Sequence, residues 1–137
     1  GKQKILYLGN LDAKRDWGHA RDYVIAMWKI LQLKQPDDFV IATGKQYSIR
    51  QFIGFVSKKL NMKIIWKGKG LKEKGYDTIS KRNIISIDKN YIRPLDVNTL
   101  LGNASKARKK LSWKPKINIH QLIDEMISEE VKILDNE

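Results

Sequence analysis

Two arginines have side chains that could bind an anion. Arg15 follows Lys14, and Arg93 precedes a proline, with the acidic residue Asp96 three positions later. A guanidinium group offers phosphate oxygens a planar, bidentate set of N–H donors that an ammonium group lacks. By local chemistry alone, however, Arg15 beside Asp16 is more simply an ion pair at the start of a helix, and Arg93 is more simply a surface turn residue.

The charge of the whole chain also favours anions. The 27 Lys and Arg residues outnumber the 15 Asp and Glu residues, which gives a net charge of +12. Such a charge attracts phosphate in nucleic acid, in a nucleotide or at an anionic lipid surface, and it does not choose among them. Because many lysines stand in runs without a recognised motif, a solvated basic surface is favoured over a dedicated nucleic-acid patch.

Composition excludes several kinds of chemistry. The 137 residues, with 42% hydrophobic and 31% charged, suit one soluble domain, and no cysteine is present. Disulfides, thiolate zinc sites and a cysteine nucleophile are therefore excluded, and two separated histidines make a metal site improbable. No apolar run is long enough to span a membrane or to form a signal peptide, so we expect a cytoplasmic protein.

The first third of the chain predicts a strand, a helix and a second strand. A short apolar run at 4–8 ends at a Gly-Asn pair, and apolar residues then recur at helical spacing to Leu31, with Asp16 as the expected helix cap. Residues 38–43 form a continuous apolar run closed by Gly44, which is typical of a strand covered on both faces of a parallel sheet. We expect residues 5–43 to complete a larger sheet whose earlier strands precede Gly1.

The rest of the chain predicts further helices and strands, so the fold class is α/β throughout. Ser48 and Gln51 form a capping box at the start of a helix. Asn103 and Asn118 are the expected caps of a short helix and of a final long helix. The other expectations are a strand at 62–66, a mobile Gly- and Lys-rich loop at 67–82 and a strand at 83–88.

Six segments resemble the GDP-mannose 4,6-dehydratases, which are extended short-chain dehydrogenases/reductases. They are LGNLDAKRDWGHARDYVIAMW at 8–28, PDDFVIATG at 36–44, WKGKG at 66–70, YIRPLDV at 91–97, LGNASKA at 101–107 and LSWKP at 111–115. A lone Arg-Asp pair is shared by all extended members, whereas GNLDAKRDWG is far more specific to this branch. The resemblance covers essentially the whole chain.

The resemblance implies the C-terminal part of such an enzyme. Residues 1–44 are then the terminal strand-helix-strand piece of a Rossmann-type domain, and residues 45–137 are the smaller α/β substrate-binding domain. The implied reaction converts GDP-mannose to GDP-4-keto-6-deoxymannose. Tightly bound NADP takes hydride from C4, water leaves across C5 and C6, and hydride returns at C6. A homo-oligomer is also expected.

The resemblance also assigns roles to residues of this chain. It favours anion binding by Arg15 and Arg93 over the ion pair and the surface turn that local chemistry suggests. Arg15 and Arg93 match family arginines that contact the diphosphate, and Asp96 matches an acidic residue that binds the ribose. Asn10 and Lys14 are further candidates for the nucleotide end. The family pattern is Arg-Pro-Thr-Glu-Val-Asp, so Asp96 is one methylene shorter than the family residue and Asn98 replaces an aspartate.

The catalytic motifs of the family are not found in this sequence. No tyrosine is followed four positions later by lysine, and the glycines between 66 and 75 lack the spacing of a phosphate-binding turn. We therefore assign no catalytic, cofactor-binding or metal-binding residue, and expect no catalysis by this chain alone. The four tryptophans are expected to be packing anchors, and His19 and His120 to be surface residues at helix N-termini without a catalytic role.

Three other kinds of protein remain as alternatives. The first is a different sugar-nucleotide dehydratase or epimerase, because this part of the enzyme determines which nucleotide is bound better than which reaction is catalysed. The second is a basic nucleic-acid-binding module, supported by a pI of about 9.9. Such a module would lose affinity steeply with salt and would show no preference for GDP. An interaction piece without a ligand is a third possibility.

Overall fold

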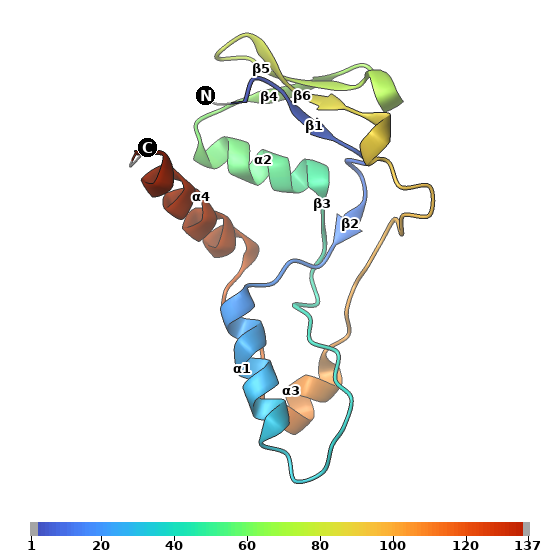
Figure 1. Ribbon diagram of the computed structural model, residues 1–137, viewed down its shortest axis with the longest axis vertical. Helices are drawn as coiled ribbons and strands as arrows, with labels where there is room; N and C mark the ends of the chain where they lie inside the picture. Colours follow the sequence, from blue (N-terminus) through green and yellow to red (C-terminus); the bar gives the residue numbers. More distant parts are fainter. Residues whose placement is uncertain (1–2, 136–137) are drawn as a thin grey trace. The chain divides into compact units, whose positions relative to one another are not determined.

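The computed structural model describes residues 3–135, and they form two compact units. Each unit is built from two separate stretches of chain: the first from Gly1–Ala13 and Ser48–Asn98, the second from Lys14–Tyr47 and Thr99–Glu137. Helices and strands occur together, so the α/β class is confirmed (Figure 1). The predicted domain division at residue 44 concerns a longer protein and stays a prediction.

The first unit contains a four-stranded sheet in the order β1-β6-β5-β4. Its strands are β1 (Leu6–Leu8), β4 (Ile64–Lys67), β5 (Lys74–Asp77) and β6 (Arg82–Ile87). β1 is parallel to β6, and the other pairs are antiparallel. The first predicted strand is therefore present, with β6 as its partner and β1 at the edge of this sheet, and the expectation that it completes a larger sheet stays a prediction.

Helix α2 (Ile49–Lys59) runs along one face of this sheet (Figure 1). The predicted capping box is confirmed: the Ser48 hydroxyl accepts the Gln51 N–H, and the Gln51 side chain accepts the Ser48 N–H. Apolar side chains of α2, β1 and β6 line a cavity of about 350 Å³. The helix is thus fixed at its first turn and by its apolar face.

The predicted loop at 67–82 is wrong, because six of its sixteen residues belong to strands β4, β5 and β6. It contains the short 3-10 helix η1 (Gly70–Lys72) and strand β5. Strand β5 is hydrogen-bonded to β4 on one side and to β6 on the other. Gly75 lets β5 pack closely, since an added Cβ would lie 3.1 Å from atoms of Ile85 and Trp66. The sequence did not predict β5 because strands are recognised by β-branched and aromatic residues, whereas β5 contains glycine and lysine.

The second unit contains three helices among its described residues: α1 (Ala20–Leu31), α3 (Ser105–Leu111) and α4 (Ile119–Asp135). α1 and α3 pack together, and Lys29 Nζ donates to the carbonyl oxygens of Leu111 at 2.8 Å and Ser112 at 3.2 Å. The ammonium group therefore satisfies carbonyls at the end of α3. The buried core is Ala26, Ala42, Ala104, Ala107, Leu111 and Trp113.

Two short strands complete the secondary structure, and one predicted strand is missing from it. β2 (Lys14–Arg15) and β3 (Tyr47–Ser48) form a two-stranded sheet. Residues 38–43 are not a strand, which contradicts the prediction. An apolar run forms a strand only when its backbone N–H and C=O groups are hydrogen-bonded to a neighbouring strand. No described strand pairs with residues 38–43.

The helix caps agree only in part with the sequence patterns. His19, and not Asp16, caps α1, because its Nδ1 accepts the Arg21 N–H at 3.0 Å. Asn118 caps α4 as predicted, through the N–H groups of His120 and Gln121. The Asn103 side-chain oxygen accepts the Ser105 N–H. The N-cap position of α3, however, is occupied by Ala104 and not by Asn103.

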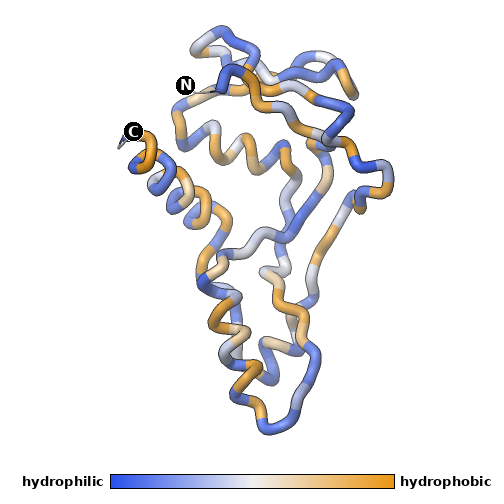
Figure 2. The backbone as a smooth tube through the Cα atoms, viewed as in Figure 1, coloured by the Kyte–Doolittle hydropathy of each residue, from blue (hydrophilic) through white to orange (hydrophobic). Residues whose placement is uncertain are grey.

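Large apolar side chains also lie on the surface of the second unit. Along α1, Val24, Met27, Trp28 and Leu31 are 60–80% exposed, and Figure 2 shows apolar segments recurring along this helix. The expectation that every tryptophan is a packing anchor therefore fails for Trp28. In the described part of the chain, no helix combines the length and apolar character needed to cross a bilayer.

Candidate functional site

A cavity of about 300 Å³ lies in the first unit where β1 and β6 end. Because these two strands are parallel, their carboxyl ends open at the same edge of the sheet, the position where ligands bind in many α/β proteins. The cavity is lined by Gly9, Asn10, Leu11, Asp12, Gly70, Leu71, Glu73, Ile87 and Ile92.

Close backbone contacts hold one side of this cavity in place. The Asp88 N–H donates to the Leu8 carbonyl at 2.9 Å, and Asp88 caps the 3-10 helix η2 (Lys89–Tyr91). A Cβ on Gly9 would lie 2.2 Å from the Tyr91 carbonyl oxygen, so only glycine permits this approach. The Asn10 side-chain oxygen accepts the Asp12 N–H at 3.0 Å, which shapes the turn after β1.

Three of the five predicted site residues belong to the first unit. Asn10 lines the cavity, and Arg93 directly follows Ile92, which lines it as well. Arg93 is exposed, and its carbonyl accepts the N–H of the half-buried Asp96 at 3.1 Å in a turn. Asn10 and Ile92 thus line the same cavity, and Arg93 and Asp96 belong to the turn that follows Ile92 in the chain.

The other two predicted residues, Lys14 and Arg15, lie in the second unit on β2. Lys14 is exposed, and its carbonyl accepts hydrogen bonds from the Leu100 N–H at 3.2 Å and from Arg15 Nη1 at 2.8 Å. The carboxylate of the neighbouring Asp16 accepts hydrogen bonds from residues 43 and 44. One carboxylate oxygen accepts the N–H and hydroxyl of Thr43, and the other accepts the Gly44 N–H at 2.8 Å.

Sequence reasoning missed an ion cluster at the wall of the first-unit cavity. Arg50 donates from Nε and Nη2 to Asp12 at 2.9 and 3.2 Å, and from Nη1 and Nη2 to Glu73 at 2.7 and 3.2 Å. Its guanidinium carbon also lies 4.7 Å from the centre of the Trp66 ring. The capping box predicted the start of α2, but nothing in the sequence connected Arg50 to partners 38 and 23 residues away.

These contacts shift the ionisation of the cluster. Hydrogen bonds from Arg50 hold the pKa of Asp12 below its usual value, although partial burial opposes this effect. Hydrogen bonds to Glu73 and then to Asp12 raise the pKa of Arg50. The guanidinium is therefore a permanent cation, and four of its five N–H donors are already engaged.

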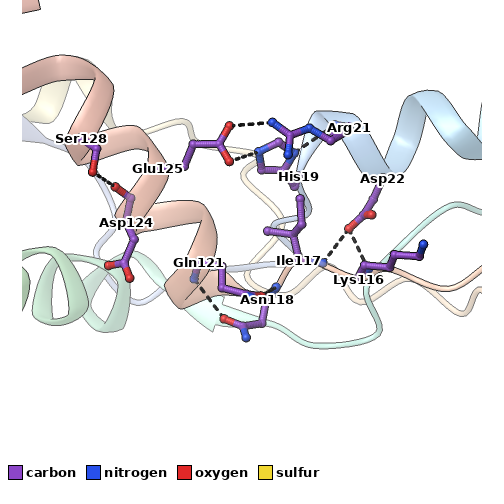
Figure 3. Close-up of polar contacts among 10 residues, drawn as sticks. All are labelled: His19, Arg21, Asp22, Lys116, Ile117, Asn118, Gln121, Asp124, Glu125 and Ser128. Carbon is purple, nitrogen blue, oxygen red and sulfur yellow. Dashed lines mark hydrogen bonds and ion pairs between the residues drawn. The ribbon is translucent and has the colours of Figure 1, made fainter. Parts of the chain in front are cut away.

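A second polar cluster joins α1 to the region of α4 within the second unit (Figure 3). The buried Asp22 accepts the N–H groups of Lys116 and Ile117, each at 2.9 Å. His19 Nε2 lies 3.2 Å from a Glu125 carboxylate oxygen, a partner that the sequence did not identify. Sequence spacing gave no signal for these contacts, which join residues far apart in the chain.

The second unit also contains a larger cavity, of about 460 Å³, lined by Trp17, Thr43, Lys45, Tyr47 and residues 115–120. None of the five predicted residues lines it, so its size alone does not make it the candidate site. Within residues 3–135, no group of His, Asp or Glu side chains is placed to hold a metal ion.

Comparison with known proteins identifies a family that matches most of the chain. Residues 1–126 match the family described as GDP-mannose 4,6 dehydratase. A GDP-mannose 4,6 dehydratase of Dictyostelium discoideum is 46% identical over 136 residues, covering 99% of this chain and 38% of that protein. This chain therefore spans little more than a third of such a relative's length.

Solved structures show the same fold at lower identity. A UDP-glucose 4-epimerase from Thermotoga maritima, solved with UDP-glucose, is 18% identical with a TM-score of 0.70 and covers 95% of this chain and 36% of its own. A dTDP-glucose 4,6-dehydratase from Bacillus anthracis, solved with NAD, is 18% identical with a TM-score of 0.69 and covers 94% and 35%. With the family match over most of its length, this chain belongs to the GDP-mannose 4,6-dehydratase family.

Proposed function

We propose that this chain supplies GDP-mannose recognition to a GDP-mannose 4,6-dehydratase, which converts GDP-mannose to GDP-4-keto-6-deoxymannose. The observation that carries the proposal is the cavity at the ends of β1 and β6, with Asn10 in its wall and Arg93 directly after the lining residue Ile92 in the chain. Arg93 binds the diphosphate through its guanidinium fork, and Asp96 accepts a ribose hydroxyl. Arg15 and Lys14 add cationic contacts on the strength of the family resemblance.

We expect the residues that carry out the redox chemistry to lie outside the described part of this chain. In the complete enzyme, NADP would supply the hydride chemistry. Residues 3–135 of this chain do not fit that cofactor. Its glycine-rich segment leads into the three-residue helix η1 and strand β5, and not into a long helix whose N-terminus could hold a diphosphate. We therefore expect this chain alone to be inactive, and we place the complete enzyme in the cytoplasm as a homo-oligomer.

Nucleotide preference is the property that tests this function. Isothermal titration of the chain with GDP, UDP and ADP at several salt concentrations should show binding with a clear preference for GDP. A basic nucleic-acid module would instead bind single-stranded or duplex DNA with affinity that falls steeply with salt. Equal affinity for the three nucleotides would contradict the guanine preference, and UDP preference would favour another sugar-nucleotide enzyme of the same fold.

A further inference from the structure

We propose that Arg50 is a positioning residue for the cavity at the ends of β1 and β6, holding its two walls together without touching the nucleotide. This inference rests on the proposed function, because it concerns the same cavity. One wall contains Asn10 and Asp12, and the other contains Gly70 and Glu73.

The two walls come from distant parts of the chain, and Arg50 joins them. Its guanidinium forms a bidentate pair with Asp12, at 2.9 and 3.2 Å, and a second bidentate pair with Glu73, at 2.7 and 3.2 Å. The pair with Glu73 is the more shielded, since the Arg50 and Glu73 side chains are 27% and 17% exposed, whereas Asp12 is 75% exposed. The Glu73 pair should therefore contribute more to holding the walls.

The backbone around Arg50 restrains it further. Its N–H donates to the Leu11 carbonyl at 2.9 Å, and the Ile49 N–H donates to the Ala13 carbonyl at 3.2 Å. The first turn of α2 is thus attached to the same wall that contains Asp12. The Trp66 ring, 4.7 Å from the guanidinium carbon, covers one face of the cation.

These restraints give Arg50 a role different from that of Arg93. Four hydrogen bonds already use its N–H donors, so little capacity remains for a phosphate oxygen. Its positive charge still favours nucleotide binding, because it offsets the negative charges of Asp12 and Glu73 at a cavity proposed to bind the GDP diphosphate. A lysine would keep the charge but could not form two planar forks at once.

The experiment is isothermal titration of GDP into the chain carrying Arg50→Lys, compared with the wild-type chain and with Arg82→Lys. Arg82 is an exposed arginine of β6 in the same unit and serves as the matched control. We expect Arg50→Lys to raise the Kd about tenfold with unchanged stoichiometry, and Arg82→Lys to leave both unchanged. A purely structural role would reduce the fraction of competent protein, and so the stoichiometry, while the Kd stayed the same.

A second variant covers the case in which Arg50→Lys fails to fold, as judged by circular dichroism. Glu73→Gln keeps the cation and the Asp12 pair but weakens the fork to the other wall, and it should raise the Kd about threefold. If wild-type protein binds GDP and the folded variants bind it equally well, the positioning role of Arg50 is overturned while the proposed function stands. If wild-type protein does not bind GDP, both are overturned.

Discussion

The indole Nε1 of Trp113 donates a 2.8 Å hydrogen bond to the backbone carbonyl of Asp22, inside the core of the second unit. Both residues are 3% exposed. The Asp22 carboxylate meanwhile accepts the N–H groups of Lys116 and Ile117. A single residue of α1 therefore orders the segment that connects α3 to α4.

Asp22→Ala should destabilise the second unit. The substitution removes the acceptor of two backbone N–H groups in a partly buried region, and leaving such donors unpaired costs about 2 to 3 kcal/mol. Urea denaturation followed by circular dichroism would measure the loss. Glu130→Ala, at an exposed position of α4, is the control and should change the unfolding free energy by less than about 0.5 kcal/mol. Equal stability of the two variants would show that the Asp22 bonds contribute nothing net.

Gly9→Ala and Gly54→Ala should have opposite effects. A Cβ on Gly9 would lie 2.2 Å from the backbone oxygen of Tyr91, which cannot move aside as a flexible side chain could, so the variant should lose about 1 to 3 kcal/mol. Gly54 lies within α2 with nothing within 4 Å, so alanine there should add about 0.5 to 1 kcal/mol. Thermal melts of the two variants make the comparison, and a stabilised Gly9→Ala would contradict the close approach.

Sequence patterns predicted the local features of this fold well. Apolar spacing located α1, α2 and α4, and short polar motifs located the first turns of α2 and α4. Each of these signals lies within one helical turn or one short apolar run, so a single stretch of sequence contains it. The buried face of α3, with Ala107 and Leu111 inward, was predicted for the same reason.

Features that depend on distant partners could not be predicted in this way. The pairing of β1 with β6 joins residues nearly eighty positions apart, and β5 is a strand because both neighbours bond it, in spite of its glycine and lysines. The Arg50 cluster has the same origin. At the candidate site, the family resemblance named Asn10 and Arg93, but the wall that Arg50 holds became visible only in three dimensions.

Asp77 should make the first unit acid-sensitive. Its carboxylate accepts the N–H groups of Ser80, Lys63 and Ile79, and these bonds, with that of Ser80 the strongest cause, lower its pKa to about 2. An unfolded aspartate titrates near 3.9. The contribution of Asp77 to stability is therefore complete above about pH 4 and is lost as the pH falls through about 2.

Urea denaturation of the wild-type chain and of Asp77→Asn, repeated between pH 5 and pH 2, tests this prediction. The asparagine variant should be less stable at pH 5, because a neutral amide is a weaker acceptor for three backbone N–H groups. The difference between the two proteins should narrow toward pH 2. A difference that stays constant with pH would mean that the ionised carboxylate is not what stabilises this turn.

Arg93→Ala should weaken GDP binding more than any other change of an exposed arginine in the first unit. A charge-assisted hydrogen bond contributes about 1.5 to 3 kcal/mol, which corresponds to roughly a ten- to hundredfold rise in Kd. Arg93→Lys should recover only part of this loss, because an ammonium group keeps the charge without the fork. Arg82→Ala, on the exposed part of β6, should bind GDP as the wild-type chain does. Unchanged affinity of Arg93→Ala would mean that the phosphate contact is wrong, and the segment after η2 would then serve only to close the cavity wall at Ile92.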